Sequence, residues 1–377
     1  MSPDPVQPVS GEEVGVPQPG IGVCLSGGGY RAMVFHLGAL WRLYDAGVLR
    51  VVDRISSVSG GSITAGLLAL KWNQLSFDPA RLPSDFIPHV VQPIRSLASE
   101  TIDAEAIILG VPLPGHVSDR ITAAYERHLF GGATLQDLPD HPRFVINATN
   151  MQSGVLWRFS KPYMGDYRVG RVERPALLLA RAVAASSAFP PVLSPVELRL
   201  NPDDFKAGSG GDLQCPPFTS KVILSDGGVY DNLGLETVWK RYQTVLVSDG
   251  GGRLRAEEEP KVDWARHAYR VLEVIDNQVR ALRKRYLIDS FVTHTRSGGY
   301  WGIRTNIADY NLADALPCPF DRTTELAEVA TRLKRLSDDV QERLINWGYA
   351  VCDAALRRHY IPHLARPTGF PYPGAGV

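Results

Sequence analysis

Short apolar runs, glycine turns and helix-like stretches alternate along the first 70 residues. Residues 21–25 form an apolar run next to glycine, which is typical of a buried strand. Residues 30–46 carry apolar side chains at helical spacing, and Gly47 is placed to end that helix. A second strand is predicted at 54–58 and a second helix at 62–72. This strand–helix–strand–helix order predicts an α/β fold with a parallel sheet and helices on its faces.

The middle of the chain contributes further strands and two irregular segments. Residues 73–142 mix helix and loop, and residues 201–220 form a long polar loop, so both are expected to be insertions. Apolar runs bounded by turn residues predict strands at 143–149, 155–160, 222–225 and 244–248.

The two ends of the chain have different patterns. Residues 1–19 are rich in proline and predict a flexible leader, and they lack the basic and apolar regions of a secretory signal. Near the other end, apolar residues recur at steps of three and four from Leu326 to Trp347, which predicts one long amphipathic helix. Packing against the sheet is favoured for this helix over a lipid- or partner-binding face. We expect a single domain over residues 20–377, with a helical C-terminal extension.

The composition excludes several classes of protein. Lys+Arg and Asp+Glu both number 40, and a net charge of zero argues against nucleic-acid binding. No run of about 18 apolar residues is present, so any contact with a membrane is expected to be peripheral. The four cysteines lie far apart without a CxxC pair, which argues against a metal cluster or a disulfide framework. A reducing, cytoplasmic location is therefore expected.

The second predicted strand ends in a candidate nucleophile. A serine at a sharp turn between strand and helix exposes its hydroxyl over the sheet, and small neighbours are needed because the backbones crowd there. Ser59, followed by Gly60 and Gly61, fits this pattern, with Ser57 where the first glycine of the motif is usual. The amino end of the next helix also favours developing negative charge. The same residues could form only a tight turn and a helix cap, so Ser59 is a candidate.

The first predicted strand ends in a glycine loop. Gly27, Gly28 and Gly29 present backbone amides that no side chain covers, and such amides can hold a phosphate or an oxyanion. Arg31 adds a fixed cation that would steady the loop or meet a lipid phosphate. The spacing from Gly27 to Ala32 also fits a dinucleotide-binding motif, but the next strand does not end in the acidic residue that would bind ribose. Nucleotide binding is therefore the less favoured alternative.

A serine nucleophile needs a base. None of the nine histidines lies in a motif that indicates a catalytic triad. A partly desolvated carboxylate within hydrogen-bond reach of the hydroxyl can serve instead. Asp226 closes an apolar strand and is followed by Gly227 and Gly228, at the edge where open α/β sheets place their sites. Asp249 ends the next strand in nearly the same context and is the rival candidate.

Together these segments resemble the patatin-like phospholipase family. SGGGYR at 26–31 resembles its oxyanion loop, SVSGGS at 57–62 its serine elbow, and DGG at 226–228 its aspartate motif. The small-residue block at 180–191, which ends in two prolines, is similar to the one that precedes the aspartate in that family. The four segments stand in the family's order, and this favours Asp226 as the base.

The resemblance implies a patatin-like three-layer α/β/α sandwich with a mostly parallel central sheet. It implies a lipid acyl hydrolase, a phospholipase or esterase, that acts on phospholipid or neutral lipid and needs no cofactor or metal. Peripheral membrane contact is compatible with such a substrate. The alternative is a catalytically inactive lipid-binding or regulatory protein on the same fold. The residues implied are the catalytic pair Ser59 and Asp226, and the oxyanion loop of Gly27, Gly28, Gly29 and Arg31.

Overall fold

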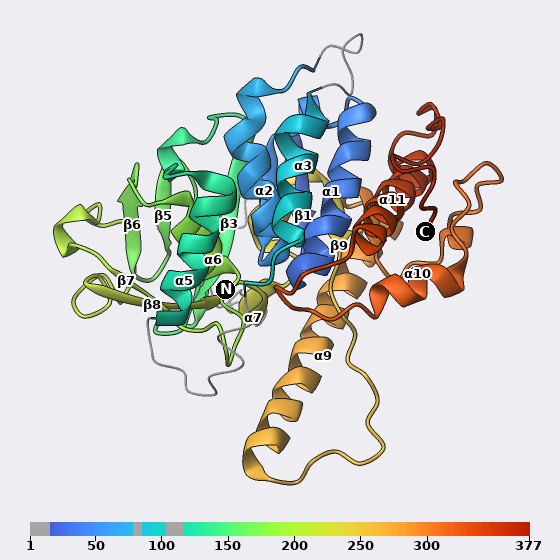
Figure 1. Ribbon diagram of the computed structural model, residues 1–377. Helices are drawn as coiled ribbons and strands as arrows, with labels where there is room; N and C mark the ends of the chain where they lie inside the picture. The colour runs from blue at the N-terminus through green and yellow to red at the C-terminus, as the bar shows by residue number, and fades with distance from the viewer. Residues whose placement is uncertain (1–15, 78–84, 103–115) are drawn as a thin grey trace, which may run out of the picture.

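The structure describes most of the chain (Figure 1). Most of the predicted leader, residues 1–19, lies outside the described residues, as does part of the insertion predicted near 73–142. The last residues of the leader are not coil, because the first strand already begins at Gln18. The described residues of this computed structural model are 16–77, 85–102 and 116–377.

Five parallel strands form the centre of a ten-stranded sheet. β1 lies between β9 and β2, and β10 and β3 follow on the two sides. All four pairings among them are parallel, which confirms the predicted parallel centre. The bounds are β1 Gln18–Leu25, β2 Arg54–Val58, β3 Arg143–Asn150, β9 Tyr242–Asp249 and β10 Ser297–Gly302.

The remaining strands pair in antiparallel fashion. β4, β5 and β6 continue the sheet beyond β3, while β8 pairs with both β3 and β7. β5, β6, β7 and β10 were not predicted, because they are four to six residues long and three of them contain glycine, which weakens a strand pattern. The polar segment 201–220 is irregular apart from one short turn, as predicted. The bounds are β4 Val155–Phe159, β5 Tyr163–Asp166, β6 Gly170–Glu173, β7 Val196–Arg199 and β8 Lys221–Asp226.

Helices cover both faces of the parallel strands. α1 packs with α2, α3 and α11 on one face, and α8 with the end of α9 lies on the other (Figure 1). The predicted three-layer α/β/α arrangement is thus confirmed. The bounds are α1 Gly29–Asp45, α2 Gly60–Lys71, α3 Gln92–Ala98, α5 His116–Tyr125, α6 Leu179–Ser186, α7 Gly228–Asp231, α8 Glu236–Trp239, α9 Trp264–Val292, α10 Phe320–Ala327 and α11 Asp338–Ala355.

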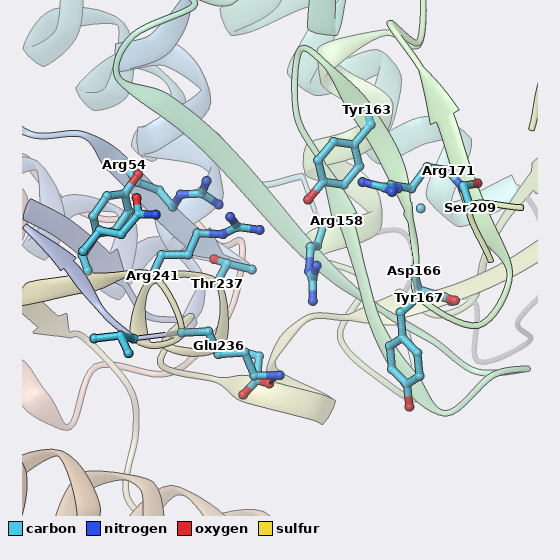
Figure 2. A pocket seen from close by; sticks show the side chains of 15 residues that line it. Arg54, Arg158, Tyr163, Asp166, Tyr167, Arg171, Ser209, Glu236, Thr237 and Arg241 are labelled. Carbon is cyan, nitrogen blue, oxygen red and sulfur yellow. Dashed lines mark hydrogen bonds and ion pairs between the residues drawn. The ribbon is translucent and has the colours of Figure 1, made fainter. Parts of the chain in front are cut away.

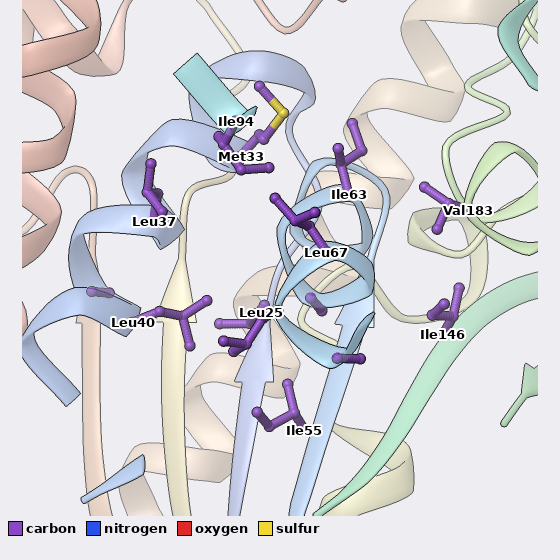
Figure 3. Packing of buried hydrophobic residues seen from close by; sticks show 14 of the residues in the cluster. Leu25, Met33, Leu37, Leu40, Ile55, Ile63, Leu67, Ile94, Ile146 and Val183 are labelled. Carbon is purple, nitrogen blue, oxygen red and sulfur yellow. The ribbon is translucent and has the colours of Figure 1, made fainter. Parts of the chain in front are cut away.

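The alternation of side chains along β1 divides the core in two. Val23 and Leu25 point to one face and Cys24 to the other, as successive residues of a strand must. On the first face Leu25 belongs to the larger core, together with Met33 and Leu40 of α1 (Figure 3). The smaller core on the second face includes Leu287 of α9. β1 is therefore apolar throughout its second half because it is covered on both sides.

The prediction of one long helix from Leu326 to Trp347 is wrong. The structure has two helices here, since α10 ends at Ala327 and α11 begins at Asp338. The intervening residues carry no regular helix or strand. We call residues 328–336 the strap.

Hydrogen bonds to distant parts of the fold hold the strap in place. The carbonyl of Arg332 accepts the amide of Tyr30, at the start of α1, at 3.0 Å. The amide of Leu336 donates to the carbonyl of Ala98, at the end of α3, at 2.8 Å. Backbone groups bonded in this way cannot also close helical turns, so tertiary contacts override the periodic pattern.

The helix α9 was not predicted, and it is the longest in the described part of the chain, with 29 residues. Its last turns pack beside β10, while its first half extends away from the body (Figure 1). Within residues 16–77, 85–102 and 116–377, no helix combines the length and the apolar character that crossing a bilayer requires.

Candidate active site

The carboxyl ends of β2 and β8 meet at one point of the sheet. Both strands pair with the same edge of β3, β2 in parallel and β8 in antiparallel orientation. Val58 of β2 lies opposite Asn147, and the next residue of β3, Ala148, lies opposite Asp226. Because the two strands run toward each other, Ser59, which follows Val58, comes beside Asp226.

Ser59 occupies a strained turn between β2 and α2. Its φ of 51° and ψ of −121° lie in a region that residues with a side chain rarely adopt. The next two residues must be small. A Cβ at Gly60 would lie 2.1 Å from the carbonyl oxygen of Gly29, and one at Gly61 would lie 2.6 Å from that of Leu25. The local geometry is that of a nucleophile elbow at the carboxyl edge of the sheet.

A chain of buried hydroxyl groups fixes this turn. Ser186, at the end of α6, accepts the amide of Ser59 at 3.0 Å and donates to the carbonyl of Asn147 at 2.6 Å. The hydroxyl of Ser62 lies 2.9 Å from that of Ser186 and 3.0 Å from that of Ser57. Ser57, which stands where the motif usually has glycine, is therefore a hydrogen-bonding member of the turn.

Two residues of this support were missed by sequence reasoning. The one signal for Ser186 was its place in the small-residue block at 180–191. Asn147 donates from its side-chain nitrogen to the carbonyl of Ser57 at 2.9 Å. Nothing in the apolar pattern of β3 marks Asn147, because the strand is buried along nearly its whole length.

Asp226 is buried beside Ser59. Its Oδ1 accepts the amide of Gly228 at 2.7 Å. Burial raises the pKa of the carboxyl group to about 7, and hydrogen bonds from Gly228 and from the Ser59 hydroxyl oppose part of that rise. Among the described residues, Oδ2 has no partner that meets ordinary hydrogen-bond geometry, and catalytic hydrogen bonds are often poorly formed before substrate binds. The carboxyl group is thus poised to exchange a proton near neutral pH.

Asp249, the rival candidate, lies in a different environment. It ends β9, which is separated from β2 by β1. Its carboxylate accepts the Tyr300 hydroxyl at 2.8 Å and the Gly251 amide at 2.9 Å. Burial acts to raise its pKa, but the charge of Arg280 and these hydrogen bonds outweigh burial and lower it. A carboxylate held so firmly in its charged form is a weak base.

His36, the buried histidine of this region, makes hydrogen bonds to residues other than Ser59. One ring nitrogen of His36 lies 2.8 Å from the Ser248 hydroxyl, and the other lies 2.9 Å from the carbonyl oxygen of Ser26. Burial lowers the pKa of His36 to about 4, so the ring is neutral at physiological pH. Its hydrogen bonds brace the glycine loop through Ser26 and do not reach Ser59.

The predicted oxyanion loop lies against Ser59 and turns sharply into α1. A Cβ at Gly27 would lie 3.1 Å from that of Ser59. Gly28 and Gly29 have φ values of 148° and 61°, which favour glycine. The Gly27 amide donates to the carbonyl of Asn232 at 3.0 Å and is therefore already used. The amides of Gly28 and Gly29 have no acceptor within the described part of the chain, as expected of a first helical turn.

Arg31 acts as a clamp behind this loop. Its Nε and Nη2 both donate to the carbonyl of Gly250 at 3.2 Å. Its guanidinium group also donates to the Val329 carbonyl and, at 2.9 Å, to the Thr331 hydroxyl, both in the strap. Burial lowers the pKa of Arg31 to about 10. Of the two roles expected for Arg31, the contacts fit steadying the loop, because its donors are already bonded to the protein.

A side chain at Gly28 is expected to impair any oxyanion held by this loop. A Cβ there would lie 2.8 Å from the Gly250 carbonyl oxygen, at a φ that L-residues rarely adopt. Gly28→Ala should lower kcat by about 10²–10³-fold, which is the usual effect of losing one oxyanion donor. Turnover of a soluble acyl ester and the melting temperature, measured together, separate this loss from unfolding. Gly131→Ala, at a left-handed glycine with open space around it, is the matched control. Equal turnover by Gly28→Ala and wild type would contradict this role.

Two exposed apolar side chains flank Ser59 and Asp226. Phe189 is 47% exposed and follows Ala188, whose carbonyl accepts the amide of Asp226 at 3.0 Å. Val229 is 50% exposed and lies in α7, directly after the glycines that follow Asp226. Exposed apolar side chains therefore stand in the two segments next to Asp226.

Comparisons with solved structures give distant likenesses. The human GIVD cytosolic phospholipase A2 in complex with methyl gamma-linolenyl fluorophosphonate is 14% identical, with a TM-score of 0.48, over 89% of this chain and 57% of that one. The same human enzyme in another structure gives 15% identity and a TM-score of 0.40, over 64% and 49%. VipD from Legionella pneumophila gives 15% and 0.36, over 89% and 66%. This chain thus spans about half to two thirds of their length. A comparison with curated protein sequences gave no match.

A comparison with family models gives a broader result. The model described as Patatin-like phospholipase matches residues 23–239, which is more than half of the chain. The matched range begins within β1 and ends with α8, so it contains the glycine loop, the Ser59 turn and Asp226. The chain belongs to the patatin-like phospholipase family.

Proposed function

We propose that this protein hydrolyses fatty acyl esters of lipids through an acyl-serine intermediate, with Ser59 as nucleophile and Asp226 as base. Family membership supports lipid acyl hydrolysis at a general level. The observation that carries the finer assignment is the buried carboxyl group of Asp226, with a pKa of about 7, beside a serine at a strained elbow. These two groups supply the proton acceptor and the nucleophile that acyl transfer requires.

The reaction runs in two halves. Asp226 takes the Ser59 proton while Oγ attacks the acyl carbonyl, and the open amides of Gly28 and Gly29 bind the developing oxyanion. Collapse of the tetrahedral species expels the alcohol, which takes its proton from Asp226 and leaves the acyl group on Ser59. Water then gives a proton to Asp226 and attacks the acyl-serine. The fatty acid leaves, and the proton returns to Ser59.

The rate is expected to depend on the protonation of Asp226. Only the ionised carboxylate can accept the serine proton, and burial has raised its pKa to about 7. Below that pH the base is mostly protonated, so kcat/KM should fall about tenfold for each unit of decreasing pH, and it should level off above it. A pH profile with a soluble ester measures this directly. A profile that is flat from pH 5 to 8 would rule out Asp226 as the base.

The proposal is tested by chemical labelling and product analysis. A fluorophosphonate probe should modify Ser59, which peptide mass spectrometry locates, and Ser59→Ala should not be labelled. Incubation with a mixed lipid extract should release free fatty acids from the wild type only. Modification of another residue, or lipid binding without fatty-acid release, would overturn the assignment and favour a non-catalytic lipid-binding protein.

Phe189 is expected to contact the acyl chain. Replacing it with Ser removes apolar surface worth about 1.5–3 kcal/mol when buried, which corresponds to about a 10–100-fold loss of kcat/KM on long-chain esters. Short-chain esters do not reach this surface and should be cleaved at nearly the wild-type rate. Phe320→Ser, on α10, is the matched control because Phe320 is 51% exposed. Equal losses on p-nitrophenyl acetate and palmitate would exclude a role in chain binding.

A further inference from the structure

The described residues enclose a pocket at the edge of the sheet opposite Ser59 and Asp226 (Figure 2). Its volume is about 400 Å³, within the usual range of small-molecule sites. Arg54, the first residue of β2, lines it, whereas Ser59 follows the last residue of the same strand. The first residue of β9 and parts of β4 and β5 complete the wall. This pocket is thus separate from the proposed active site.

The lining of the pocket has an excess of positive charge. Its two acids are engaged, because Glu236 pairs with Lys240 at 2.7 Å and the Asp166 carboxylate accepts the amide of Asn150 and the hydroxyl of Ser153, both at 2.8 Å. Besides Lys240, which is paired with Glu236, four arginine side chains line the same space, namely Arg54, Arg158, Arg171 and Arg241.

Arg54 is the most deeply placed of these cations. It is 8% exposed, and its Nε has no hydrogen-bond partner among the residues described. Burial, followed by the like charge of Arg241, lowers the pKa of Arg54. Figure 2 shows the guanidinium groups of Arg54 and Arg241 next to each other, directed toward Tyr163 and Arg158. Gathering like charges around a cavity is unfavourable unless an anion joins them.

The positive charges of the pocket also shift the pKa of Tyr163. Burial would raise its pKa, but the charge and hydrogen bond of Arg158, followed by the charges of Arg241 and Arg54, outweigh burial and lower it. Three guanidinium groups therefore act on one position in the pocket. Arginine donors in this number suit a group with several anionic oxygens, which they bind with paired hydrogen bonds.

We propose that this pocket binds a phosphate-bearing small molecule, with Arg54 and Arg241 as its principal ligands. Isothermal titration calorimetry of the Ser59→Ala protein with pyrophosphate, at constant ionic strength, should show one binding site. Arg54→Gln and Arg241→Gln should each weaken binding at least tenfold. Arg322→Gln, an exposed arginine on α10, is the matched control and should bind normally.

Two further measurements keep this test decisive. Without ligand, Arg241→Gln should raise the melting temperature, because it removes a repulsion from buried Arg54. Soluble dioctanoyl phosphatidic acid, used in place of pyrophosphate, shows whether the phosphate comes from a lipid headgroup or a free compound. Absence of binding by both ligands, or binding that both glutamine variants retain, would overturn the proposal.

A separate observation concerns α9, whose amphipathic pattern is inverted. The side facing the protein is polar in the middle of the helix, with Arg280 3.8 Å from Asp249 and Arg283 3.3 Å from Glu236, and becomes apolar only near its end, at Leu287. The outward side is apolar, and Ile275 there is 54% exposed. An exposed apolar stripe of this length marks a surface that another molecule covers. The stripe consists of Trp264, Ala268, Val271, Ile275, Val279, Leu282 and Tyr286, all exposed.

The stripe is symmetric about Ile275. Trp264 and Tyr286 each lie eleven residues from it, Ala268 and Leu282 seven, and the two valines four. An antiparallel copy centred on Ile275 would place Trp264 against Tyr286 and the small Ala268 against the larger Leu282. A spacing of eleven residues matches three turns of a nearly straight helix, so the residues of the α9 stripe stay on one face of the helix. This self-complementarity is what a two-fold interface requires.

The charges at the two ends of α9 favour the same antiparallel arrangement. Before the helix stands the exposed acidic run from Glu257 to Glu259, and Glu257 lies 3.5 Å from Arg270 in the first half of α9. Near the other end stands the basic run from Arg283 to Arg285, in which Arg283 is paired with Glu236 of the same chain and Arg285 is exposed. Antiparallel pairing sets the acidic run of one copy near the exposed Arg285 of the other.

We infer that the α9 stripe pairs with α9 of a second copy of this chain. Sedimentation should show a dimer, and Ile275→Glu should give a folded monomer with an unchanged circular dichroism spectrum. Arg266→Glu, on the opposite side of the same helix, should remain dimeric. A monomeric wild type, or one that instead sediments with lipid vesicles, would overturn the inference.

Cross-linking tests the direction of pairing. In a Cys215→Ser background, which removes the exposed cysteine, Ile275→Cys should form an intermolecular disulfide on mild oxidation because it faces itself across the two-fold axis. Trp264→Cys should not, because Trp264 would face Tyr286. Cross-linking of both variants at equal rates would contradict the antiparallel arrangement.

Discussion

Replacing Ser59 with Ala is expected to lower kcat toward acyl esters by about 10⁴–10⁶-fold, as loss of a catalytic serine does elsewhere. The residual rate would come from binding and from the Gly28 and Gly29 amides. The fold should be unaffected, because alanine occupies the same strained backbone and the Ser59 amide keeps its bond to Ser186. Turnover of a p-nitrophenyl ester and the melting temperature provide the two measurements.

Two companion variants sharpen this result. Ser220→Ala, in the polar loop 201–220, should retain full turnover. Ser59→Gly should be equally inactive but more stable, because the φ of 51° costs a residue with a side chain about 1–3 kcal/mol. Turnover by Ser59→Ala within tenfold of wild type would remove Ser59 from the mechanism.

Replacing Asp226 with Asn is the second large effect, with an expected loss of about 10²–10⁴-fold in kcat. Asparagine keeps the shape of the side chain but cannot take the serine proton. The same change should stabilise the protein at neutral and alkaline pH, because it removes a carboxylate whose ionisation burial opposes. Activity and stability are thus expected to move in opposite directions.

The pH dependence of this stabilisation has a definite sign. In the fold, the Asp226 pKa is raised from 3.8 to about 7, so the folded state holds a proton that the unfolded state releases. Wild-type stability from this group is greatest below pH 4 and declines as the pH rises to about 7. The melting temperature of Asp226→Asn should exceed that of wild type more at pH 8 than at pH 5. A constant difference would mean that Asp226 is not buried in its neutral form, and unchanged activity would exclude it as the base.

The sequence predicted the centre of the fold because its signals there are local. The strand at 54–58 and the helix after it are bounded by Ser59 and two glycines, whose small size is needed where Gly60 approaches the Gly29 carbonyl. The strand that ends at Asp226 carries a similar signal. Turn chemistry and apolar runs of this kind depend on neighbours along the chain, so one sequence can reveal them.

The errors arose where distant contacts decide the outcome. The strap breaks a helical pattern because Arg332 and Leu336 bond to other elements. The Gly27 amide was expected to be open, yet the Asn232 carbonyl accepts it, and Ser186 reaches the Ser59 amide from another helix. No spacing rule relates such residues, since they are brought together only by the packed sheet.

The hydrogen bonds of Arg31 join the glycine loop to the C-terminal part of the chain. Val329 and Thr331, which bind its guanidinium group, lie 298 and 300 positions further along the chain and well past residue 239, where the family match ends. The residues common to the family therefore do not by themselves define a self-sufficient catalytic module. The shape of the glycine loop is a property of the whole polypeptide, so substitutions in the C-terminal third can alter turnover without changing Ser59, Asp226 or the glycine loop itself.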